Sequence, residues 1–582
     1  MIFSEAFEVR DRVKDSGVLE KWLADLKCEA EKYLAEGIEN YTLADFMDYY
    51  ETGERTGFER IYFSKRGRLA AFAMMIYVFN DKRFAAPLEE TIASVCSEKT
   101  WALPAHIPRE RLGVCETWID LFAAETGFAL SEIKYLIGSE LSAEIKSRIS
   151  REVRKRIIEP YLSEEREEYS WQTAENNWSA VCSGSIGAAC FYEGTDEENR
   201  KAVRMAERSL ECFVRSFSAE GICMEGFGYW NYGFGFFSAY AQLLFQYTGG
   251  RRDYFKSDRV KNIAGFLNAG QLRMNCPIAF SDLSVVQKPN MGTAHFLHDK
   301  YSEIKLYREG YMNYNDDKCF RWAFKIRDAV WTVKYGVEKY EEDNKCDEFR
   351  FYPDAQWYIR KTPRMILCAK GGNNAEPHNH NDVGSFYVDS YQGQLLTDPG
   401  SGEYTEAYFN ENTRYSILPV SSFGHNLPII GGKGQSTGSA ARAEVHEASP
   451  ECLRMELSAA YDVKGLESFV RKISVCNDTV VVEDCFDTSD SVSEIREHFV
   501  SKIMPSAVGR KVRLGGCCEI SCGDMTPIVS CKEYRASGGK SEMLYFIDFA
   551  AENVSGQTCF KTVIKVSEYE KTKCDEKEQK NE

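Results

Sequence analysis

The sequence predicts an α+β protein with two large domains, an array of helical hairpins followed by an antiparallel β-sandwich. Three observations predict this class. Apolar residues recur at helical spacing up to about residue 340, a charged stretch over 337–345 interrupts the pattern, and beyond it the apolar period changes to two. A chain of 582 residues is also too long for one ordinary hydrophobic core. We therefore expect a helical domain over 1–340 and a β-domain over 346–567.

The helical domain is best illustrated by residues 200–217, where apolar side chains repeat at helical spacing and charges occupy the other face. Further segments have similar spacing: 67–79, 112–124, 141–158, 179–192 and 234–247. Many of these segments are apolar on more than one face, as expected when helices pair in two layers. The pattern therefore favours helical hairpins over helices that lie singly on a surface.

The β-domain is expected from short runs with alternating apolar residues, separated by Gly, Asn-Asp and Ser clusters. The clearest runs are 348–352, 355–359, 469–475, 479–483 and 542–548. Such runs fit an antiparallel sandwich. Residues 568–582 are nearly all charged, and we expect this tail to fray.

Composition excludes several classes of partner. The formal charge of −17 argues against nucleic acid and against an anionic membrane surface. No stretch of about 18 apolar residues is present, so no membrane-spanning helix is expected. An anionic substrate would need a local basic or polar pocket, and a short oligomer would be admitted more easily than a long polymer. The sequence does not specify an oligomeric state.

The cysteines and the first residues bear on the cellular compartment. Twenty cysteines are scattered without a C-x-x-C pair, and a chain of this size needs no disulfide to be stable. The first ten residues carry acids where a signal peptide needs a basic region and an apolar run. We therefore expect a cytoplasmic protein with reduced thiols.

The densest group of chemically capable side chains lies in the β-domain. His380, Asp398 and His425 offer two imidazoles and a carboxylate, a ligand set that suits a divalent cation such as zinc. Two short strands predicted over 385–397 could carry these ligands to one sheet edge. For an isolated His378-x-His380 pair, local hydrogen bonding on a strand would be the better interpretation. The downstream Asp-Pro-Gly and His-Asn sequences favour a metal.

Two segments rich in amides and aromatic residues interrupt the helical domain. The first is Asn176-Asn177-Trp178, and the second spans 224–233 with three glycines among tyrosine and tryptophan. Glycine permits sharp backbone turns and leaves room for a ligand, so the second segment is a candidate cleft mouth. The alternatives are that Asn176 caps the next helix and that the aromatic residues pack an ordinary loop.

Together, the histidine-rich motif and these two segments resemble the heparinase II/III-like polysaccharide lyases. The resemblance covers most of the chain and implies an (α/α) toroid followed by an antiparallel β-sandwich. It implies cleavage of uronic-acid glycans, glycosaminoglycan-like or alginate-like, by β-elimination, with an acidic oligosaccharide as substrate. Such a reaction removes the weakly acidic C5 proton, so donors must stabilise the developing dianion while a base and an acid act at C5 and O4.

The resemblance also assigns roles to individual residues. Asn176 or Asn177 would hold the substrate carboxylate, with His378 beside it. Tyr232 and Tyr415 would be the catalytic tyrosines, and a phenol can act as base or acid if its pKa is lowered locally. Several relatives have Asn-His where this chain has Asn-Asn. That departure leaves open whether Tyr232 alone serves as base and acid.

The same resemblance implies a structural metal, zinc or a similar divalent ion, held by His380, Asp398 and His425. Substrate contacts are expected from Glu225, Tyr229, Trp230, Arg414 and His106. Structural roles are the alternative for each of them, and a position at a helix end is the ordinary explanation for His106.

Two rival functions remain open at this point. A glycoside hydrolase acting on unsaturated uronides would need two carboxyl groups flanking the scissile bond, and Glu225 is one candidate without an evident partner. A non-catalytic glycan-binding protein with a structural metal would need neither tyrosine. Replacing Tyr232 by Phe separates a lyase from a hydrolase, and binding without turnover on any uronide would indicate the non-catalytic protein.

Overall fold

The computed structural model describes residues 1–165, 168–274, 276–283, 288–342, 345–489 and 492–567. The predicted charged tail, 568–582, lies outside the described residues, as do residues 343–344 of the expected boundary. The chain divides into two compact units. The first comprises Met1–Phe217, Phe227–Pro277 and Val286–Glu342, and the second comprises Ser218–Gly226, Ile278–Val285 and Asp343–Glu582.

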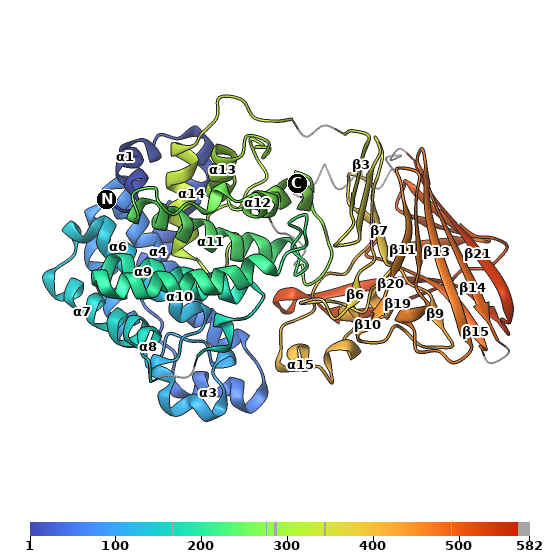
Figure 1. The fold of residues 1–582 in the computed structure, drawn as a ribbon, viewed down its shortest axis with the longest axis horizontal. Helices are drawn as coiled ribbons and strands as arrows, with labels where there is room; N and C mark the ends of the chain where they lie inside the picture. Colours follow the sequence, from blue (N-terminus) through green and yellow to red (C-terminus); the bar gives the residue numbers. More distant parts are fainter. Residues whose placement is uncertain (166–167, 275, 284–287, 343–344, 490–491, 568–582) are drawn as a thin grey trace. The chain divides into compact units, whose positions relative to one another are not determined.

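The first unit is helical (Figure 1). Its α-helices are α1 (Ser4–Val13), α2 (Glu20–Glu36), α3 (Leu43–Thr52), α4 (Thr56–Phe79), α5 (Ala85–Cys96), α6 (Leu121–Ile137), α7 (Ala143–Val153), α8 (Glu159–Leu162), α9 (Asn177–Glu193), α10 (Asp196–Arg215), α11 (Phe227–Tyr247), α12 (Asp258–Gly270), α13 (Met291–Lys300) and α14 (Trp322–Lys334). Of the helices in the described ranges, none combines the length and apolar character needed to cross a bilayer.

Helix α9 is buried on nearly all sides and packs against α6, α10 and α11. Small residues allow this close packing. A Cβ added to Gly187 would lie 2.4 Å from the Tyr240 ring on α11, and one added to Gly184 would lie 3.3 Å from the same side chain. The α9 and α11 backbones are therefore held close together, which positions Asn177 and Tyr232 near the amino ends of these helices.

The helix predicted over 112–124 is only partly correct. Residues Arg109–Thr117 form 3-10 turns, and α6 begins at Leu121. The Asp120 carboxylate accepts a hydrogen bond from the Ala123 backbone N–H at 2.7 Å and so caps α6. This cap makes the helix begin at Leu121. Hydrophobic periodicity alone predicts an earlier start.

The second unit is built on antiparallel strands, and the short helix α15 (Glu406–Phe409) is also part of it. One sheet has the order β11-β12-β13-β14-β21-β18-β17-β16, a second β19-β20-β15-β9, and a third β3-β4-β5-β7-β8, while β10 pairs with β6. The strands are β3 (Glu348–Tyr352), β4 (Trp357–Lys361), β5 (Ile366–Lys370), β6 (Asn373–Asn374), β7 (Phe386–Asp389), β8 (Gln394–Leu396), β9 (Ile429–Ile430), β10 (Gly438–Arg442), β11 (Glu444–Ala448), β12 (Cys452–Glu456), β13 (Leu466–Cys476), β14 (Thr479–Thr488), β15 (Glu494–Ser501), β16 (Pro505–Val508), β17 (Lys511–Leu514), β18 (Cys518–Cys522), β19 (Ile528–Arg535), β20 (Ser541–Glu552) and β21 (Gly556–Val566). Two further short strands, β1 (Gln271–Arg273) and β2 (Cys276–Pro277), pair with each other in the first unit.

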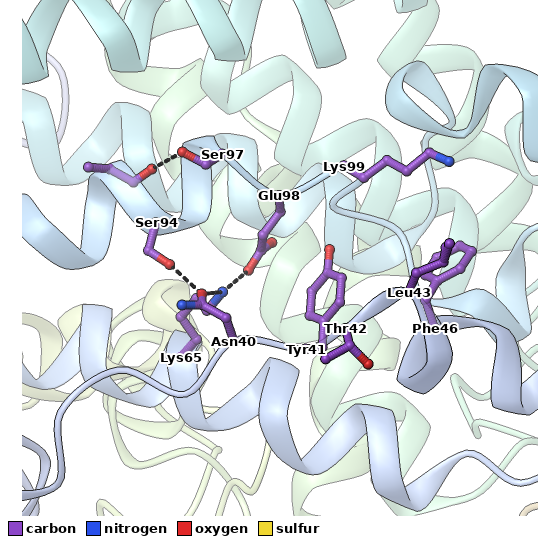
Figure 2. A pocket seen from close by; sticks show the side chains of 11 residues that line it. Asn40, Tyr41, Thr42, Leu43, Phe46, Lys65, Ser94, Ser97, Glu98 and Lys99 are labelled. Carbon is purple, nitrogen blue, oxygen red and sulfur yellow. Dashed lines mark hydrogen bonds and ion pairs between the residues drawn. The ribbon is translucent and has the colours of Figure 1, made fainter.

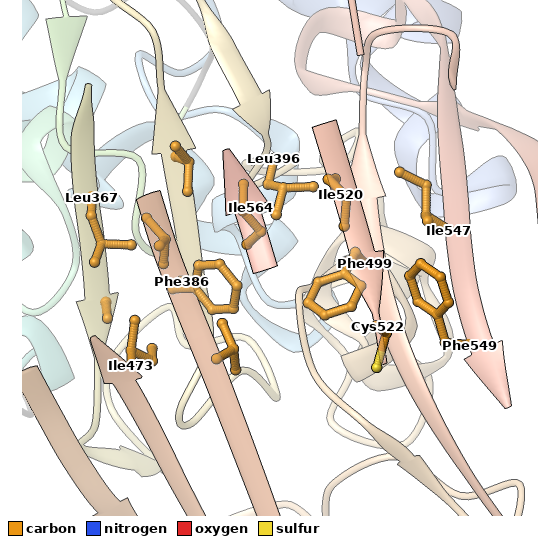
Figure 3. Packing of buried hydrophobic residues seen from close by; sticks show 14 of the residues in the cluster. Leu367, Phe386, Leu396, Ile473, Phe499, Ile520, Cys522, Ile547, Phe549 and Ile564 are labelled. Carbon is orange, nitrogen blue, oxygen red and sulfur yellow. The ribbon is translucent and has the colours of Figure 1, made fainter. Parts of the chain in front are cut away.

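The core of the second unit lies between its sheets (Figure 3). Phe386 of β7 and Phe499 of β15 are buried there, together with Ile473 of β13 and Ile564 of β21. Burial alternates residue by residue along β14, as expected for a strand with one face on a core. The period-two pattern in the sequence therefore corresponds to strands that turn one face toward the core of the sandwich.

One pair of cysteines differs from the expectation of reduced thiols. Cys485 and Cys559 form a disulfide. They occupy directly opposite positions on the neighbouring strands β14 and β21. The strand register brings these thiols together, and register is not visible in cysteine spacing.

Candidate active site

The first unit places Tyr232 in a compact charged group. Its hydroxyl donates a hydrogen bond to Glu125 Oε1 on α6. The Arg321 guanidinium lies 4.1 Å from the centre of the Tyr232 ring, and Arg321 Nε is 3.5 Å from Glu125 Oε1. Arg321 also pairs with Asp317 at 2.7 Å. A phenol, a carboxylate and a guanidinium thus meet within one unit.

Burial shifts the pKa values in this group. It raises the pKa of Glu125 to about 7, opposed by the charge of Arg321 and the hydrogen bond from Tyr232. The pKa of Tyr232 is raised well above its usual value, chiefly by burial and then by the Glu125 carboxylate, with Arg321 opposing. A lowered pKa, the condition under which a phenol alone could act as base, is therefore not met at Tyr232.

The two asparagines have different surroundings. Asn176 is the N-cap of α9, and its Oδ1 accepts the Trp178 backbone N–H at 3.0 Å. Asn177 is buried beside α11, where a Cβ added to Gly233 would lie 3.1 Å from the Asn177 Cβ. Asn176 thus has the capping role, and Asn177 lies next to the helical turn that carries Tyr232.

His106 joins an aromatic lining close to these residues. Its Nδ1 lies 2.7 Å from Asp120 Oδ2, its ring stacks on Phe122 and meets the edge of Trp178 at 4.9 Å between centroids. The Arg321 Cζ is 5.8 Å from the Phe122 ring centre. The lining therefore runs from Trp178 through His106 and Phe122 to Arg321.

A cavity of about 920 Å³ opens beside this lining. His106, Trp118, Trp171 and Trp178 are among the residues that line it. Its volume is in the range of ligand pockets, about 300–1,000 Å³.

Two residues predicted to contact substrate sit on α11. Trp230 is buried in the core of the first unit, where its Nε1 donates to the Ile263 carbonyl at 2.8 Å and its ring stacks on Phe227 and Phe234. Tyr229, its neighbour, is half-buried. Helical periodicity turns the Trp230 side chain inward, so packing explains this residue.

In the second unit, Asp282 is the centre of a buried hydrogen-bond network. Its carboxylate accepts from His378 Nδ1 at 2.7 Å, from His380 Nε2 at 3.0 Å and from Arg414 Nη2 at 3.2 Å. Tyr408 donates its hydroxyl proton to the same group. Burial alone would raise the pKa of Asp282, but the bonds from both histidines and the charge of Arg414 outweigh it and lower the pKa.

His378 is held in an unusual backbone conformation, with φ of 56°. Such a conformation is uncommon for a residue other than glycine and marks a locally constrained position. Its Nδ1 faces Asp282, and its Nε2 lies 3.7 Å from Glu225 Oε2. Burial lowers the pKa of His378, but the bond to Asp282 and the charges of Asp282 and Glu225 outweigh it, so the pKa is raised. His378 and Glu225 thus lie in one arrangement, a pairing that the sequence did not suggest.

Arg414 and Tyr415 occupy a 3-10 turn, Arg414–Ser416. Besides Asp282, Arg414 donates to the Asn379 carbonyl at 3.0 Å and lies over the Tyr408 ring. The Tyr415 hydroxyl donates to Asn379 Oδ1 at 2.8 Å. Arg414 therefore ties the histidine-bearing loop to this turn, and Asn379 orients the Tyr415 phenol.

The predicted metal ligands converge in the second unit. One ligand atom each from His380, Asp398 and His425 lies within 4.8 Å of the others, and all three residues are buried. His380 Nε2 is bonded to Asp282 and His425 Nε2 to the Pro419 carbonyl at 2.8 Å. These bonds place the ring protons on Nε2 and leave each Nδ1 as a lone-pair donor. His380 Nδ1 has no hydrogen-bond partner in the described part of the chain, and His425 Nδ1 lies 3.5 Å from Asp398 Oδ2, the third member of the set, so the donor set fits a divalent cation.

Solved structures of other proteins have the same architecture. Heparinase III matches with a TM-score of 0.64 at 12% identity, covering 98% of this chain and 94% of that chain. A heparan sulfate lyase from Pedobacter heparinus matches with a TM-score of 0.58 at 12% identity, covering 96% and 85%. A Streptomyces coelicolor chondroitin AC lyase in complex with chondroitin sulphate matches with a TM-score of 0.54 at 9% identity, covering 96% and 84%. No protein-family model and no curated protein sequence matches the chain.

This chain has a heparinase-like polysaccharide lyase fold. The predicted fold class, a helical toroid followed by an antiparallel β-sandwich, is confirmed by these matches.

Within the heparinase-like fold, sequence reasoning missed Glu125, Arg321 and Asp282. Glu125 and Asp282 are carboxylates inside mostly apolar runs, residues 121–130 and 277–283. Buried acids are rare unless paired, so each isolated acid was a detectable signal. Arg321 carried no such signal, because Glu125 and Tyr232 lie far from it in the sequence.

Proposed function

We propose that this protein is a lyase that cleaves uronic-acid-containing oligosaccharides by β-elimination. The single observation that carries the proposal is the hydrogen bond from the Tyr232 hydroxyl to Glu125 beside the Arg321 guanidinium. The fold shared with heparinase III and with the chondroitin and heparan sulfate lyases supports a lyase acting on an acidic glycan.

In the proposed reaction, Tyr232 serves first as base and then as acid. Its oxygen takes the C5 proton of the uronate while its own phenolic proton moves to Glu125. The C4–O4 bond breaks, a C4–C5 double bond forms, and the phenol donates its proton to the departing O4. Glu125 then returns its proton to Tyr232. No proton is gained or lost by the enzyme, and no second base is needed.

The raised phenol pKa is compatible with this cycle because Glu125 is the acceptor. A carboxyl group with a pKa of about 7 can exchange a proton in either direction near neutral pH. Arg321, at 4.1 Å from the ring centre, stabilises negative charge that develops on the phenol and the carboxylate. In this proposal, the Glu125 carboxylate takes the place of the histidine that the Asn-Asn pair lacks.

The substrate would be held by amide and aromatic groups of the same unit. Asn177, beside the Tyr232 turn, is the proposed donor to the uronate carboxylate. The cavity lined by His106, Trp118 and Trp178 offers ring faces on which sugar rings can stack. Aromatic walls bind the apolar faces of a sugar without requiring a basic surface, which suits a chain of charge −17.

For the second unit, we propose a structural divalent ion held by His380, Asp398 and His425. When bound, it would supply charge and fixed geometry to the loops that carry these ligands. Asp282 holds the His380 ring by Nε2 and the His378 ring by Nδ1, so one carboxylate orients both. His378 and Tyr415 remain the proposed donors of this unit.

The test is a panel of uronate oligosaccharides monitored for ultraviolet absorbance of the new conjugated double bond. Wild type should produce absorbing products, and Tyr232→Phe should lose nearly all turnover, a fall of roughly 10²–10⁴-fold. Tyr135→Phe, at an exposed tyrosine of α6, is the matched control. Full activity of the Tyr232→Phe protein would end the proposal.

A hydrolase is the second candidate, favoured by one observation. Glu125 is a buried carboxyl group with a pKa of about 7, the property of a general acid in glycoside hydrolysis. A hydrolase would release reducing ends without ultraviolet absorbance and would retain most activity in Tyr232→Phe. The two measurements on the same samples separate the candidates.

A further inference from the structure

A second cavity in the first unit, of about 600 Å³, shares no lining residue with the Glu125, Tyr232 and Arg321 group. Figure 2 shows that its lining has two characters. Asn40, Lys65, Ser94 and Glu98 form a polar side, and the apolar side includes Tyr41, Leu43 and Phe46. The polar residues come from the loop before α3 and from α4 and α5, so three parts of the unit build it.

The polar side is organised by hydrogen bonds within the protein. Lys65 Nζ donates to Asn40 Oδ1 at 2.8 Å and lies 3.0 Å from Glu98 Oε1. Ser94 Oγ donates to the same Asn40 oxygen at 2.8 Å. Arg66 pairs with Glu98 Oε1 at 2.7 Å from the far side. These contacts hold the Lys65 and Glu98 side chains in place, although both are almost fully buried.

Lys65 and Glu98, on this side, can each form one further hydrogen bond. The Lys65 ammonium has three N–H donors and bonds to two acceptors, Asn40 and Glu98. Glu98 Oε2 is buried and has no hydrogen-bond partner among the described residues. A buried carboxylate oxygen without a donor is costly, so the pair is suited to a group that both accepts and donates.

A hydroxyl group is that kind of partner, because it can accept from Lys65 and donate to Glu98. A carboxylate or phosphate could accept from Lys65 but would be repelled by Glu98 Oε2. The opposite side offers the half-buried ring of Tyr41, which suits the apolar face of a pyranose. Leu43 lines the same side and is 67% exposed, so a bound apolar face would cover it.

We propose that this cavity binds a neutral sugar of one or two rings, with hydroxyl groups on Lys65 and Glu98 and a ring face on Tyr41 and Leu43. The volume of about 600 Å³ accommodates a ligand of that size. The proposal is independent of the proposed lyase activity, because none of these residues belongs to the candidate active site.

The test measures binding of glucose, maltose, glucuronate and inorganic phosphate to the full chain by titration calorimetry and ligand-observed NMR. Glucose or maltose should bind. Glu98→Gln should weaken binding by roughly tenfold or more, since a hydrogen bond to a charged acceptor is lost. Leu43→Ala, at an exposed site, should weaken it about threefold through lost apolar contact. Circular dichroism checks folding, and Leu43→Ala decides the result if Glu98→Gln is unfolded.

Two controls separate this cavity from other sites. Val508→Ala removes a comparably exposed apolar side chain of the second unit and should leave binding unchanged. Tyr232→Phe should also leave it unchanged. Absence of neutral-sugar binding, or binding of glucuronate and phosphate in preference to glucose, would overturn the proposal. So would sugar binding that is lost in Tyr232→Phe and kept in Glu98→Gln and Leu43→Ala.

Discussion

The proposed reaction depends on Glu125, because Glu125 accepts the Tyr232 proton. Only its ionised form can accept, and burial raises the pKa of this carboxyl to about 7. We therefore expect kcat/KM to rise about tenfold per pH unit below pH 7 and to level off above it. Activity should be lost as pH falls, since protonation fills the acceptor site.

Glu125→Gln tests this expectation. The amide cannot take the proton, so activity should fall by roughly 10²–10⁴-fold and the rising limb near pH 7 should disappear. Glu144→Gln, at an exposed position of α7, is the matched control and should keep the wild-type profile. An unchanged pH profile in Glu125→Gln would remove Glu125 from the reaction.

His425 is the residue that tests the metal proposal without any assay of activity. His425→Ala removes one of the two imidazole ligands of the proposed site, so the purified protein should contain less zinc by elemental analysis. If the lost ligand contributes about 1 kcal/mol to the free energy of unfolding, the melting temperature should fall by about 2–4 °C. Chelation of wild type should reproduce the shift.

The control for that experiment is His446→Ala, since His446 is an exposed histidine of β11 in the same unit. Equal metal content in wild type and His425→Ala would contradict the proposal. So would a fall in metal content that His446→Ala shares.

Sequence reasoning found sets of residues that lie near one another in the chain. It missed residues whose partners lie far away in the chain. His380, Asp398 and His425 were predictable because their types match a metal and their spacing fits strand ends. Asp282 lies about 100 residues before the histidines it binds, and nothing in the sequence links them. The direction of the Tyr232 pKa shift could not be predicted, because it depends on burial and on Glu125, a neighbour brought in by folding.

Among the helices, the contact between α13 and α14 depends on a missing side chain. A Cβ on Gly292 would lie 2.2 Å from the Arg327 carbonyl oxygen, and the Gly292 N–H donates to Asp328 Oδ1 at 2.8 Å. Gly292→Ala should destabilise the first unit by about 1–3 kcal/mol, because the two backbones must separate. Urea unfolding monitored by circular dichroism measures the change.

Gly265→Ala, in helix α12, should change the stability in the opposite direction. Gly265 lies inside α12, and nothing lies within 4 Å of an added Cβ. Alanine there should stabilise the helix by about 0.5–1 kcal/mol, since glycine is the poorer helix former. Equal effects of the two substitutions would show that the α13–α14 approach is not tight.

Element prediction was accurate where one physical signal dominated. Residues 200–217 have clean helical periodicity and fall largely in α10, and residues 479–483 alternate and fall in β14. The segment 112–124 failed because a side-chain cap at Asp120 overrode the apolar spacing. Caps and strand registers depend on single contacts, which periodicity does not report.

For the whole molecule, the formal charge of −17 should govern the salt dependence of catalysis. Screening lengths fall from about 30 Å at 0.01 M salt to about 10 Å at 0.1 M. Added salt should therefore raise kcat/KM for an anionic oligosaccharide severalfold by weakening repulsion, and the gain should grow with the number of uronates. A steady fall in kcat/KM over this range would show that local cations such as Arg321 dominate capture.

The division of the chain into two units also limits where the protein can be truncated. The second unit recruits Ser218–Gly226 and Ile278–Val285 from the midst of the helical sequence, and those segments carry Glu225 and Asp282. A fragment expressed from residue 343 onward would contain both histidines of the loop without the carboxylate that orients them. A gene fusion made at this junction would therefore give a β-domain that lacks Asp282.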